Sequence, residues 1–396
     1  MSATSERPSP TTRVTALPPY VFAWLDDLKA AARARGAELI DLGIGNPDRP
    51  TPPAVIDAIQ QAWADPRVHG YPPFRGDERF LNAAAGFLQR RFGVTMDPAS
   101  ELLCVSGGKE AIAQTSMAFT DETSGSLVPD IYYPVHGRAT LMSGSHTHWM
   151  PLTAERGFLP DFSVVPASAI QRAKLLLLNY PHNPTGAVAT HAFFEEAVAF
   201  ARRNGLVLLS DLAYSELTFD GFVAPSVFEI AGAKEVAIEV HSTSKSFNMA
   251  GSRIGFAAGN ADVIAALMAV RNNMGYGTPV AIQRGAAYAF EHAEALTRDV
   301  AATYQARRDV VVTGLRSLGW ELESPRGTMF IWARVPAGFS SQEWTQHLID
   351  VAGVVVAPGN AFGPGGEGYF RVSLVADETR LAGAVDRLRR AGVLYR

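Results

Sequence analysis

The sequence of 396 residues contains one cysteine, few lysines and no apolar run long enough to span a bilayer. A lone cysteine excludes an intrachain disulfide and a cysteine-pair metal site, so we expect Cys104 to be a small buried residue of a strand. A membrane-spanning helix needs about 20 consecutive apolar residues. The polar N-terminus, MSATSERPSP, lacks the apolar segment of a secretory signal. We therefore expect a cytoplasmic protein.

Lysine is scarce, since five of the 35 basic residues are lysines and 30 are arginines. The formal net charge is −4, which argues against a nucleic-acid binder, because such proteins are usually basic. Apolar residues make up 47% of the chain, so it can bury a sizeable core, and its length favours two domains. Lysine-dependent chemistry has five candidates: Lys29, Lys109, Lys174, Lys234 and Lys245.

Between residues 101 and 280, short apolar segments alternate with amphipathic ones. Segments that are apolar on both faces are typical of a mostly parallel sheet covered by helices on both sides. We expect strands at 102–105, 125–128, 174–178, 206–209, 236–240 and 254–257. We expect helices at 110–119, 191–203 and 261–272.

The region after residue 280 has a different pattern, which predicts a smaller α+β domain. Before the sheet we expect helices at 21–35, 53–64 and 77–92 and a strand at 38–43. After residue 280 we expect a long helical stretch to about 318, strands at 329–335 and 370–374, and helices at 342–351 and 378–390. The predicted divisions are a disordered tail (1–14), an N-terminal arm with part of the small domain (15–50), a large domain (51–285) and a small C-terminal domain (286–396).

Polar clusters follow four of the predicted strands, where open α/β sheets place their active sites. They are SGGK (106–109), NYPHNPTG (179–186), SDLAY (210–214) and HSTSK (241–245), the last followed by Arg253. Alone, each has a structural explanation: Asp211 could cap a helix, Asn183 could form a turn, and Gly107 and Gly108 could form a tight turn.

Together, the four clusters point to one chemistry. A buried Lys245 near Arg253 would have a lowered pKa and could form a Schiff base. A glycine-rich helix start can bind a phosphate through backbone N–H groups. A buried carboxylate suits a protonated ring nitrogen. These are the requirements of pyridoxal phosphate.

The sequence resembles the class I aminotransferases, which have the type I fold of pyridoxal phosphate enzymes, from about residue 17 to 390. The resemblance rests on LGIGNP (42–47), SGGKEA (106–111), NYPHNPTG (179–186), SDLAY (210–214), HSTSKSFNMAGSRIGF (241–256) and YFRVSL (369–374). It implies an α/β fold with a mostly parallel seven-stranded sheet in the large, cofactor-binding domain. The N-terminal arm and the C-terminal segment would form the smaller α+β domain.

The resemblance also implies roles for individual residues. Lys245 would carry the cofactor and act as general acid and base, Asp211 would pair with the pyridinium nitrogen, and Tyr214 and Asn183 would bond the ring hydroxyl oxygen. Tyr133 would stack on the ring. The residues expected at the phosphate are Gly107, Gly108, Lys109, Ser242, Ser244, Arg253 and, from the partner subunit of a homodimer, Tyr71. The residues expected at the substrate are Tyr20, Gly45, Asn183 and Arg371.

The family transfers an amino group between an L-amino acid and a 2-oxo acid through aldimine, quinonoid and ketimine intermediates. Within it, ALPPYVF (16–22), LGIGNPDRPTP (42–52) and GFLPDF (157–162) resemble the LL-diaminopimelate and alanine aminotransferase-like group. The Tyr-Gly-Thr at 276–278 is typical of alanine-type members, so LL-diaminopimelate, alanine, aspartate and glutamate all stay open. Arg75, Arg138 and Arg326 are the candidates for binding an acidic side chain.

Other chemistries fit less well. Ser242-Thr-Ser-Lys245 spells the S-x-x-K of an acyl-enzyme hydrolase, but the accompanying S-D-N and K-T-G are missing. Residues 363–368 spell G-x-G-x-x-G but precede a strand, so we expect a glycine-rich loop. His136, His146 and His148 lack the spacing of a metal site, and we expect no metal. A regulator on the same fold would need a DNA-binding domain, whereas a C–S β-lyase would use the same cofactor residues and stays an alternative.

Overall fold

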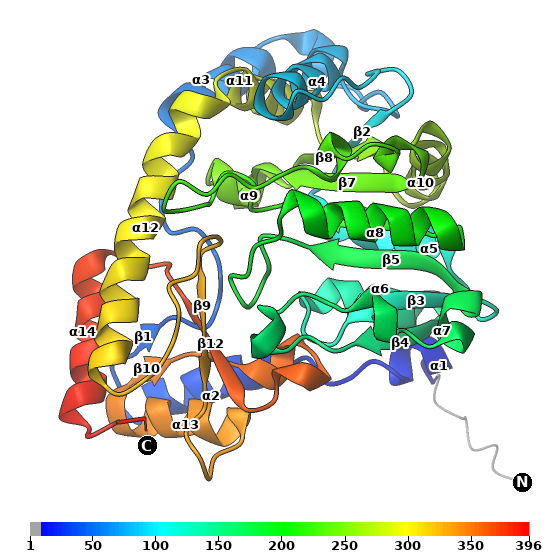
Figure 1. Ribbon diagram of the computed structural model, residues 1–396. Helices are drawn as coiled ribbons and strands as arrows, with labels where there is room; N and C mark the ends of the chain where they lie inside the picture. Colours follow the sequence, from blue (N-terminus) through cyan, green and yellow to red (C-terminus); the bar gives the residue numbers. More distant parts are fainter. Residues whose placement is uncertain (1–8, 396) are drawn as a thin grey trace, which may run out of the picture.

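A sheet of seven strands in the order β2-β8-β7-β6-β5-β3-β4 forms the centre of the computed structural model, which describes residues 9–395 (Figure 1). Only β8 runs against its neighbours, so the prediction of a mostly parallel sheet is confirmed. The strands are β2 (Leu102–Val105), β3 (Gly125–Pro129), β4 (His146–Met150), β5 (Ala173–Asn179), β6 (Val207–Asp211), β7 (Ala237–Ser242) and β8 (Gly255–Gly259).

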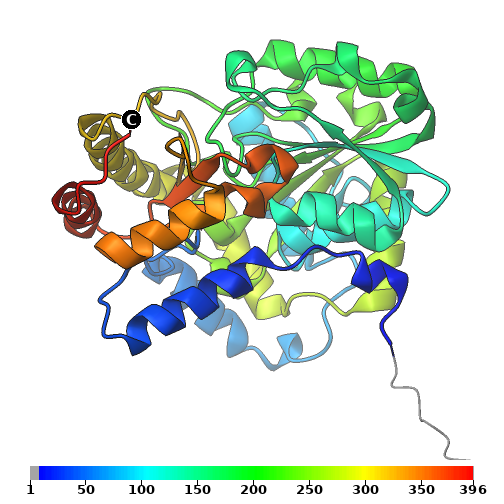
Figure 2. The same ribbon diagram turned by 90° about the horizontal axis from the view of Figure 1, so that it is seen from below.

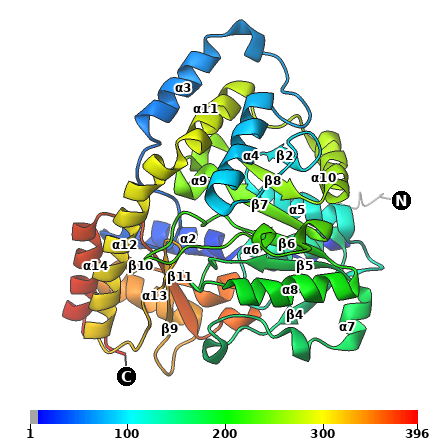
Figure 3. The ribbon, with the colours of Figure 1, turned by 45° about the horizontal axis from the view of Figure 1, so that its top comes forward.

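The central strands are apolar on both faces because each face carries its own core. Along β5, Leu175 and Leu177 join the apolar cluster of one face, whereas Leu176 and Leu178 join that of the other. The first face is covered by α5 (Gly108–Phe119), α6 (Pro134–Ser143) and α10 (Ala261–Met274). The second is covered by α4 (Glu78–Phe92), α8 (His191–Asn204) and α11 (Val280–Glu291), with α3 (Pro53–Trp63) lying beside α11 (Figure 3). A short helix, α7 (Ala167–Arg172), leads into β5.

A second core lies beside the seven-stranded sheet. It is built mostly from residues near the two ends of the chain. Its three-stranded antiparallel sheet has the order β11-β12-β9, and a parallel pair joins β1 to β10. Helix α2 packs beside α13, with Leu25 against Ile349 and Val355 (Figure 2). The elements are α2 (Val21–Ala34), β1 (Ile40–Asp41), α12 (Ala293–Ser317), β9 (Phe330–Arg334), α13 (Ser341–Ala352), β10 (Val354–Val355), β11 (Ala357–Pro358), β12 (Tyr369–Ser373) and α14 (Glu378–Arg390).

Several elements escape prediction from the sequence, among them β4 and α6, and one predicted element is divided. Strand β4 reads HTHWM, and its polar residues are tolerated because it is an edge strand. Helix α6 is buried almost all round and therefore has no amphipathic stripe. The helical stretch predicted after residue 280 breaks at His292, which separates α11 from α12.

The remaining predictions concern the chain start and the cysteine. The predicted disordered tail falls largely on residues 1–8, which lie outside the described residues, and α1 (Thr12–Thr15) is a single helical turn. Cys104 is fully buried in β2, as predicted. Among the helices of the described chain, none combines the length and apolar character that crossing a membrane requires. The domain limits at residues 50 and 285 stay a prediction.

Replacing Gly285 with alanine should destabilise the protein, because the added methyl would overlap the side chain of Ile59 where α11 crosses α3. We expect the free energy of unfolding to fall by about 1–3 kcal/mol, the usual effect of overpacking. Gly383→Ala in α14 is the matched control, since its new methyl would meet nothing within 4 Å. That variant should gain about 0.5–1 kcal/mol from helix propensity. Urea denaturation of both variants checks this, and equal stabilities would contradict it.

Candidate active site

A cavity of about 570 Å³ opens at the carboxyl ends of β5, β6 and β7, where the sheet meets the second core. Both cores and the N-terminal segment contribute to its wall. All but two of the predicted site residues line this cavity: Tyr20, Gly45, Gly108, Lys109, Tyr133, Asn183, Asp211, Tyr214, Ser242, Ser244, Lys245, Arg253 and Arg371. The structure therefore brings together in one place residues that lie up to 351 positions apart in the sequence.

Gly107 and Tyr71 are the two exceptions. Gly107 precedes α5 with φ 91°, and a Cβ at this position would lie 2.6 Å from Arg253 Nη2, so glycine is needed both for the turn and for the close approach. Tyr71 lies away from the cavity, is 79% exposed and stacks on Tyr276 with ring centroids 4.2 Å apart. It does not contribute to the cavity of its own chain.

Lys245 extends from α9 (Thr243–Ser246), the helical turn that follows β7. Its Nζ donates to the carbonyl oxygen of Gly45 at 2.6 Å. Only glycine fits at position 45, because a Cβ there would lie 2.5 Å from the ring of Phe330. Burial lowers the pKa of Lys245 to about 8, and the positive charges of Arg371 and Arg253 act in the same direction. A useful fraction of this amine is therefore neutral near neutral pH.

Asp211 ends β6 and is buried at the cavity wall. His136 Nε2 donates to its Oδ2 at 3.0 Å, and Asn179 Nδ2 donates to its backbone oxygen at 2.7 Å. Within residues 9–395, its second carboxylate oxygen, Oδ1, has no hydrogen-bond partner. A buried carboxylate oxygen without a donor is costly, so this wall is suited to a protonated ring nitrogen.

Groups suited to a phosphate lie at another part of the wall. The backbone N–H groups of Gly108 and Lys109 begin α5, whose helix dipole favours an anion. The hydroxyl groups of Ser242 and Ser244 and the guanidinium of Arg253 lie at the same cavity. This donor set, together with Asp211 Oδ1, fits pyridoxal phosphate.

Arg371 enters the cavity from β12 in the second core and is buried. Its guanidinium carbon lies 4.0 Å from the ring centroid of Phe330 and 4.5 Å from that of Phe362. Its Nη1 donates to Asn183 Oδ1 at 3.0 Å, and its Nη2 donates to Gly43 O at 2.8 Å. Burial lowers its pKa to about 9, so it is still a cation at neutral pH and can bind a carboxylate.

Sequence reasoning missed part of the cavity wall. Asn179 begins the cluster NYPHNPTG, and Ile44 and Asn46 belong to the motif LGIGNP, so their positions were usable signals. The other missed residues belong to segments without polar clusters. The additional lining residues include Phe22, Asp26, Ile44, Asn46, Asn179, Phe330 and Phe362. His136, considered above as a metal ligand, instead pairs with Asp211.

The arginines proposed for an acidic side chain do not line the cavity. Arg75 donates to Leu102 O at 2.9 Å, Arg138 donates to Pro19 O at 3.3 Å, and Arg326 lies over the ring of Phe222. The G-x-G-x-x-G segment at 363–368 is a loop before β12, as predicted. Over the described range 9–395, no group of three or more His, Cys, Asp or Glu residues is arranged to hold a metal ion.

Comparison with known proteins identifies the family of the chain. Residues 37–388 match the family model described as aminotransferase class I and II. The chain is 44% identical over 384 residues to LL-diaminopimelate aminotransferase 2 of Trichormus variabilis, covering 97% of this chain and 98% of that one. It is 45% identical over 378 residues to LL-diaminopimelate aminotransferase of Moorella thermoacetica, covering 96% and 97%. The solved structure of a probable N-succinyldiaminopimelate aminotransferase from Thermus thermophilus superposes with a TM-score of 0.89 at 37% identity, covering 94% and 100%.

The lowered pKa of Lys245 can be tested without any cofactor. In competitive acetylation of the apoprotein followed by mass spectrometry, the rate of modification of Lys245 should rise with pH and reach half its maximum near pH 8. Arg371→Met should move this midpoint to higher pH, because it removes a positive charge that disfavours the ammonium. A midpoint near the ordinary lysine value of about 10.4 would contradict the assignment.

Proposed function

The chain belongs to the class I and II aminotransferases, and from this premise we propose that it moves the amino group of LL-diaminopimelate to a 2-oxo acid. It is a pyridoxal phosphate-dependent transferase that acts on an amino acid and a 2-oxo acid. The observation that carries the assignment of roles is the partnerless Asp211 Oδ1 in the same cavity as Lys245, within the described part of the chain. Relatives that are 44% and 45% identical carry the name LL-diaminopimelate aminotransferase, which supports the substrate.

In this proposal, residues at the carboxyl edge of the seven-stranded sheet would hold the cofactor. Asp211, whose carboxylate pairs with His136, would accept a hydrogen bond from the ring nitrogen. Asn183 and Tyr214 would bond the ring oxygen, and Tyr133 would cover the ring face; all three line the cavity. The phosphate would be held by Gly107, Gly108, Lys109, Ser242, Ser244 and Arg253, and by Tyr71 of a second subunit.

Pyridoxal phosphate supplies an aldehyde that captures an amine and a ring that withdraws electrons from the Cα of the amino acid. The chain supplies the rest of the chemistry. Because the pKa of Lys245 is lowered to about 8, its neutral Nζ can take the Cα proton and later return it. Arg371 fixes the substrate carboxylate by a charge-assisted pair, which orients the Cα proton toward Lys245. Tyr20 and Phe22, from the N-terminal segment, complete the cavity wall.

One acidic side chain at the cavity, Asp26, favours a substrate side chain that carries an amino group. Asp26 lines the cavity with a side chain that is 60% exposed, so its carboxylate is accessible. Lys29 Nζ lies 2.6 Å from Asp26 and 3.0 Å from Asp41, so two carboxylates share one ammonium and leave a net negative charge. LL-diaminopimelate carries a second ammonium that can pair with Asp26, whereas aspartate and glutamate carry none on their side chains.

We also propose a homodimer. Tyr71 is 79% exposed, and Phe74, Met274 and Tyr276 are each more than half exposed, so this part of the surface presents large apolar side chains. Exposed apolar patches of this kind mark protein interfaces, and a partner would bury Tyr71 against a second cavity. We place the enzyme in the cytoplasm, where its single thiol, Cys104, would stay reduced.

Spectroscopy of the holoenzyme with one amino acid at a time tests the function. We expect LL-diaminopimelate to convert the cofactor to its amino form, detected as loss of the visible absorption band, with one 2-oxo acid formed per site. Its kcat/KM should exceed that of alanine, which lacks a second ammonium, by about tenfold or more. Absence of conversion by LL-diaminopimelate would overturn the substrate. Release of pyruvate and ammonia from a cysteine conjugate, without this conversion, would favour a C–S β-lyase, which no observation described above supports.

Asp26→Asn should raise the KM for LL-diaminopimelate by about two- to fivefold, the effect of one partly exposed charge pair. The KM for alanine should not change, since alanine has no second ammonium. Asp27→Asn is the matched control, because Asp27 is exposed on the same helix but does not line the cavity. Steady-state kinetics with both donors measures the effect, and an equal rise for alanine would remove Asp26 from substrate selection.

A further inference from the structure

Arg253 has a left-handed backbone, with φ 49° and ψ 55°, although it is not a glycine. This conformation is strained for a residue with a side chain and persists only where the surroundings hold it. Its guanidinium contacts two segments: Nη1 donates to Ala250 O at 3.0 Å, in the turn before Arg253, and Nη2 donates to Ser106 O at 3.4 Å, in the loop before α5. The direction of this phosphate-facing side chain therefore depends on a backbone that needs support.

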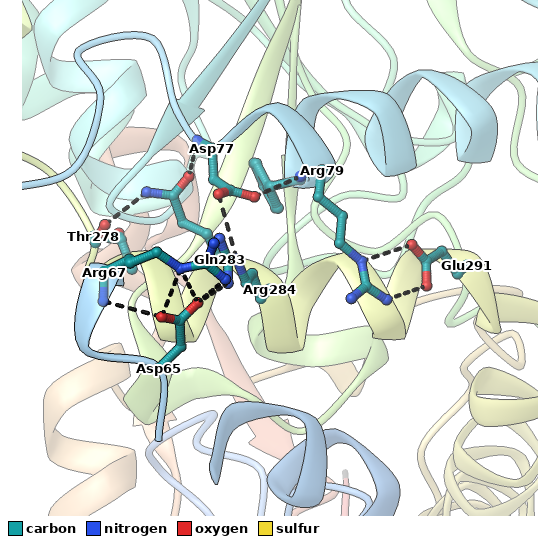
Figure 4. A network of polar contacts seen from close by, with 9 residues as sticks. Asp65, Arg67, Asp77, Arg79, Thr278, Gln283, Arg284 and Glu291 are labelled. Carbon is teal, nitrogen blue, oxygen red and sulfur yellow. Dashed lines mark hydrogen bonds and ion pairs between the residues drawn. The ribbon is translucent and has the colours of Figure 1, made fainter. Parts of the chain in front are cut away.

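The support comes from a buried chain of three hydrogen bonds, which we term the Thr278–Gln283 relay. Thr278 Oγ1 donates to the carbonyl oxygen of Arg253 at 2.9 Å. Gln283 Nε2 donates to the carbonyl oxygen of Thr278 at 2.8 Å, and Asp77 N donates to Gln283 Oε1 at 2.6 Å (Figure 4). Thr278 is 4% exposed and Gln283 is fully buried, so the bond between them is shielded from water and the two outer bonds are partly shielded.

The far end of the relay is itself anchored. Asp77 caps α4 by accepting from Phe80 N at 3.4 Å, and its carboxylate lies 3.5 Å from Arg284 Nε (Figure 4). Arg284 also reaches Asp65, which holds Arg67 in the same network. Two rigid helices, α4 and α11, therefore fix the relay, and the relay fixes Arg253.

We propose that Thr278 and Gln283 are positioning residues for the cofactor phosphate: by holding the left-handed backbone of Arg253, they set how tightly the phosphate is bound. This inference rests on the proposed role of Arg253 at the phosphate. Thr278 does not line the cavity, so its effect must pass through Arg253. Binding of the phosphate group should therefore depend on the Thr278 hydroxyl, whereas binding of the ring should not.

The test compares two probes, pyridoxal phosphate and pyridoxal, which lacks the phosphate. Titration of the full-length apoprotein, followed by absorbance, gives a dissociation constant for each. Thr278→Val keeps the shape of the side chain and removes the donor. It should raise the dissociation constant for pyridoxal phosphate by about fivefold, the effect of one lost hydrogen bond. Pyridoxal should bind as tightly as to the wild type, and Thr278→Ser, which keeps the hydroxyl, should restore phosphate binding.

Two comparisons separate positioning from a general loss of structure. Thr120→Val removes a buried hydroxyl that donates to Ser116 O at 2.7 Å, away from the cavity, and should leave both constants unchanged. In an Arg253→Ala background, Thr278→Val should add no further loss. If Thr278→Val does not fold, Thr278→Ala removes the same donor without adding a methyl group in its place.

Three results would overturn the proposed role of the Thr278–Gln283 relay. The first is unchanged binding of pyridoxal phosphate by Thr278→Val, and the second is an equal loss of affinity for both probes. The third is a loss of affinity from Thr278→Val that is just as large in the Arg253→Ala background. Failure of the proposed function has a different signature. In that case the wild type itself would bind neither probe, or Lys245→Ala would still become covalently linked to the cofactor.

Discussion

The burial of Lys245 beside two arginines is the constraint on which the site depends. Burial and the charges of Arg371 and Arg253 lower the pKa of Lys245 to about 8, and the same arginines face the places proposed for a carboxylate and a phosphate. One arrangement of charge therefore serves two purposes. In the role proposed for Arg371, a substrate carboxylate paired with it would remove part of the repulsion on Lys245, so the amine would become more basic at the stage at which it must accept a proton.

This arrangement requires both cores. Lys245 and Asp211 lie at the carboxyl edge of the seven-stranded sheet, but Arg371 comes from β12 of the second core, held between Phe330 and Phe362. Asn183 joins the two, since it lies after β5 and accepts a hydrogen bond from Arg371. The position of Arg371 relative to Lys245 therefore depends on how the second core packs on the sheet.

The sequence was sufficient to predict those features that leave a repeated apolar pattern or a cluster of polar residues. The two-sided apolar strands predicted the parallel sheet, and the polar residues after them predicted Asn183, Asp211 and Lys245 at one edge. It could not predict β4, whose polar residues are tolerated because the strand lies at an edge, or α6, which has no polar face. Nor did it pair His136 with Asp211 or place Asp26 at the cavity, because such contacts depend on how elements distant in sequence pack.

Helix α12 has a consequence for how the protein unfolds. Its first residue, Ala293, belongs to the apolar cluster of the large sheet, whereas Val300, Val311 and Leu315 belong to the second core. Both cores thus share one uninterrupted helix of 25 residues, visible as the long yellow element in Figure 1. Melting of either core would strip apolar contacts from a helix that the other core still needs. The two cores are therefore energetically coupled, and a loss of cooperativity on heating would first require this helix to break.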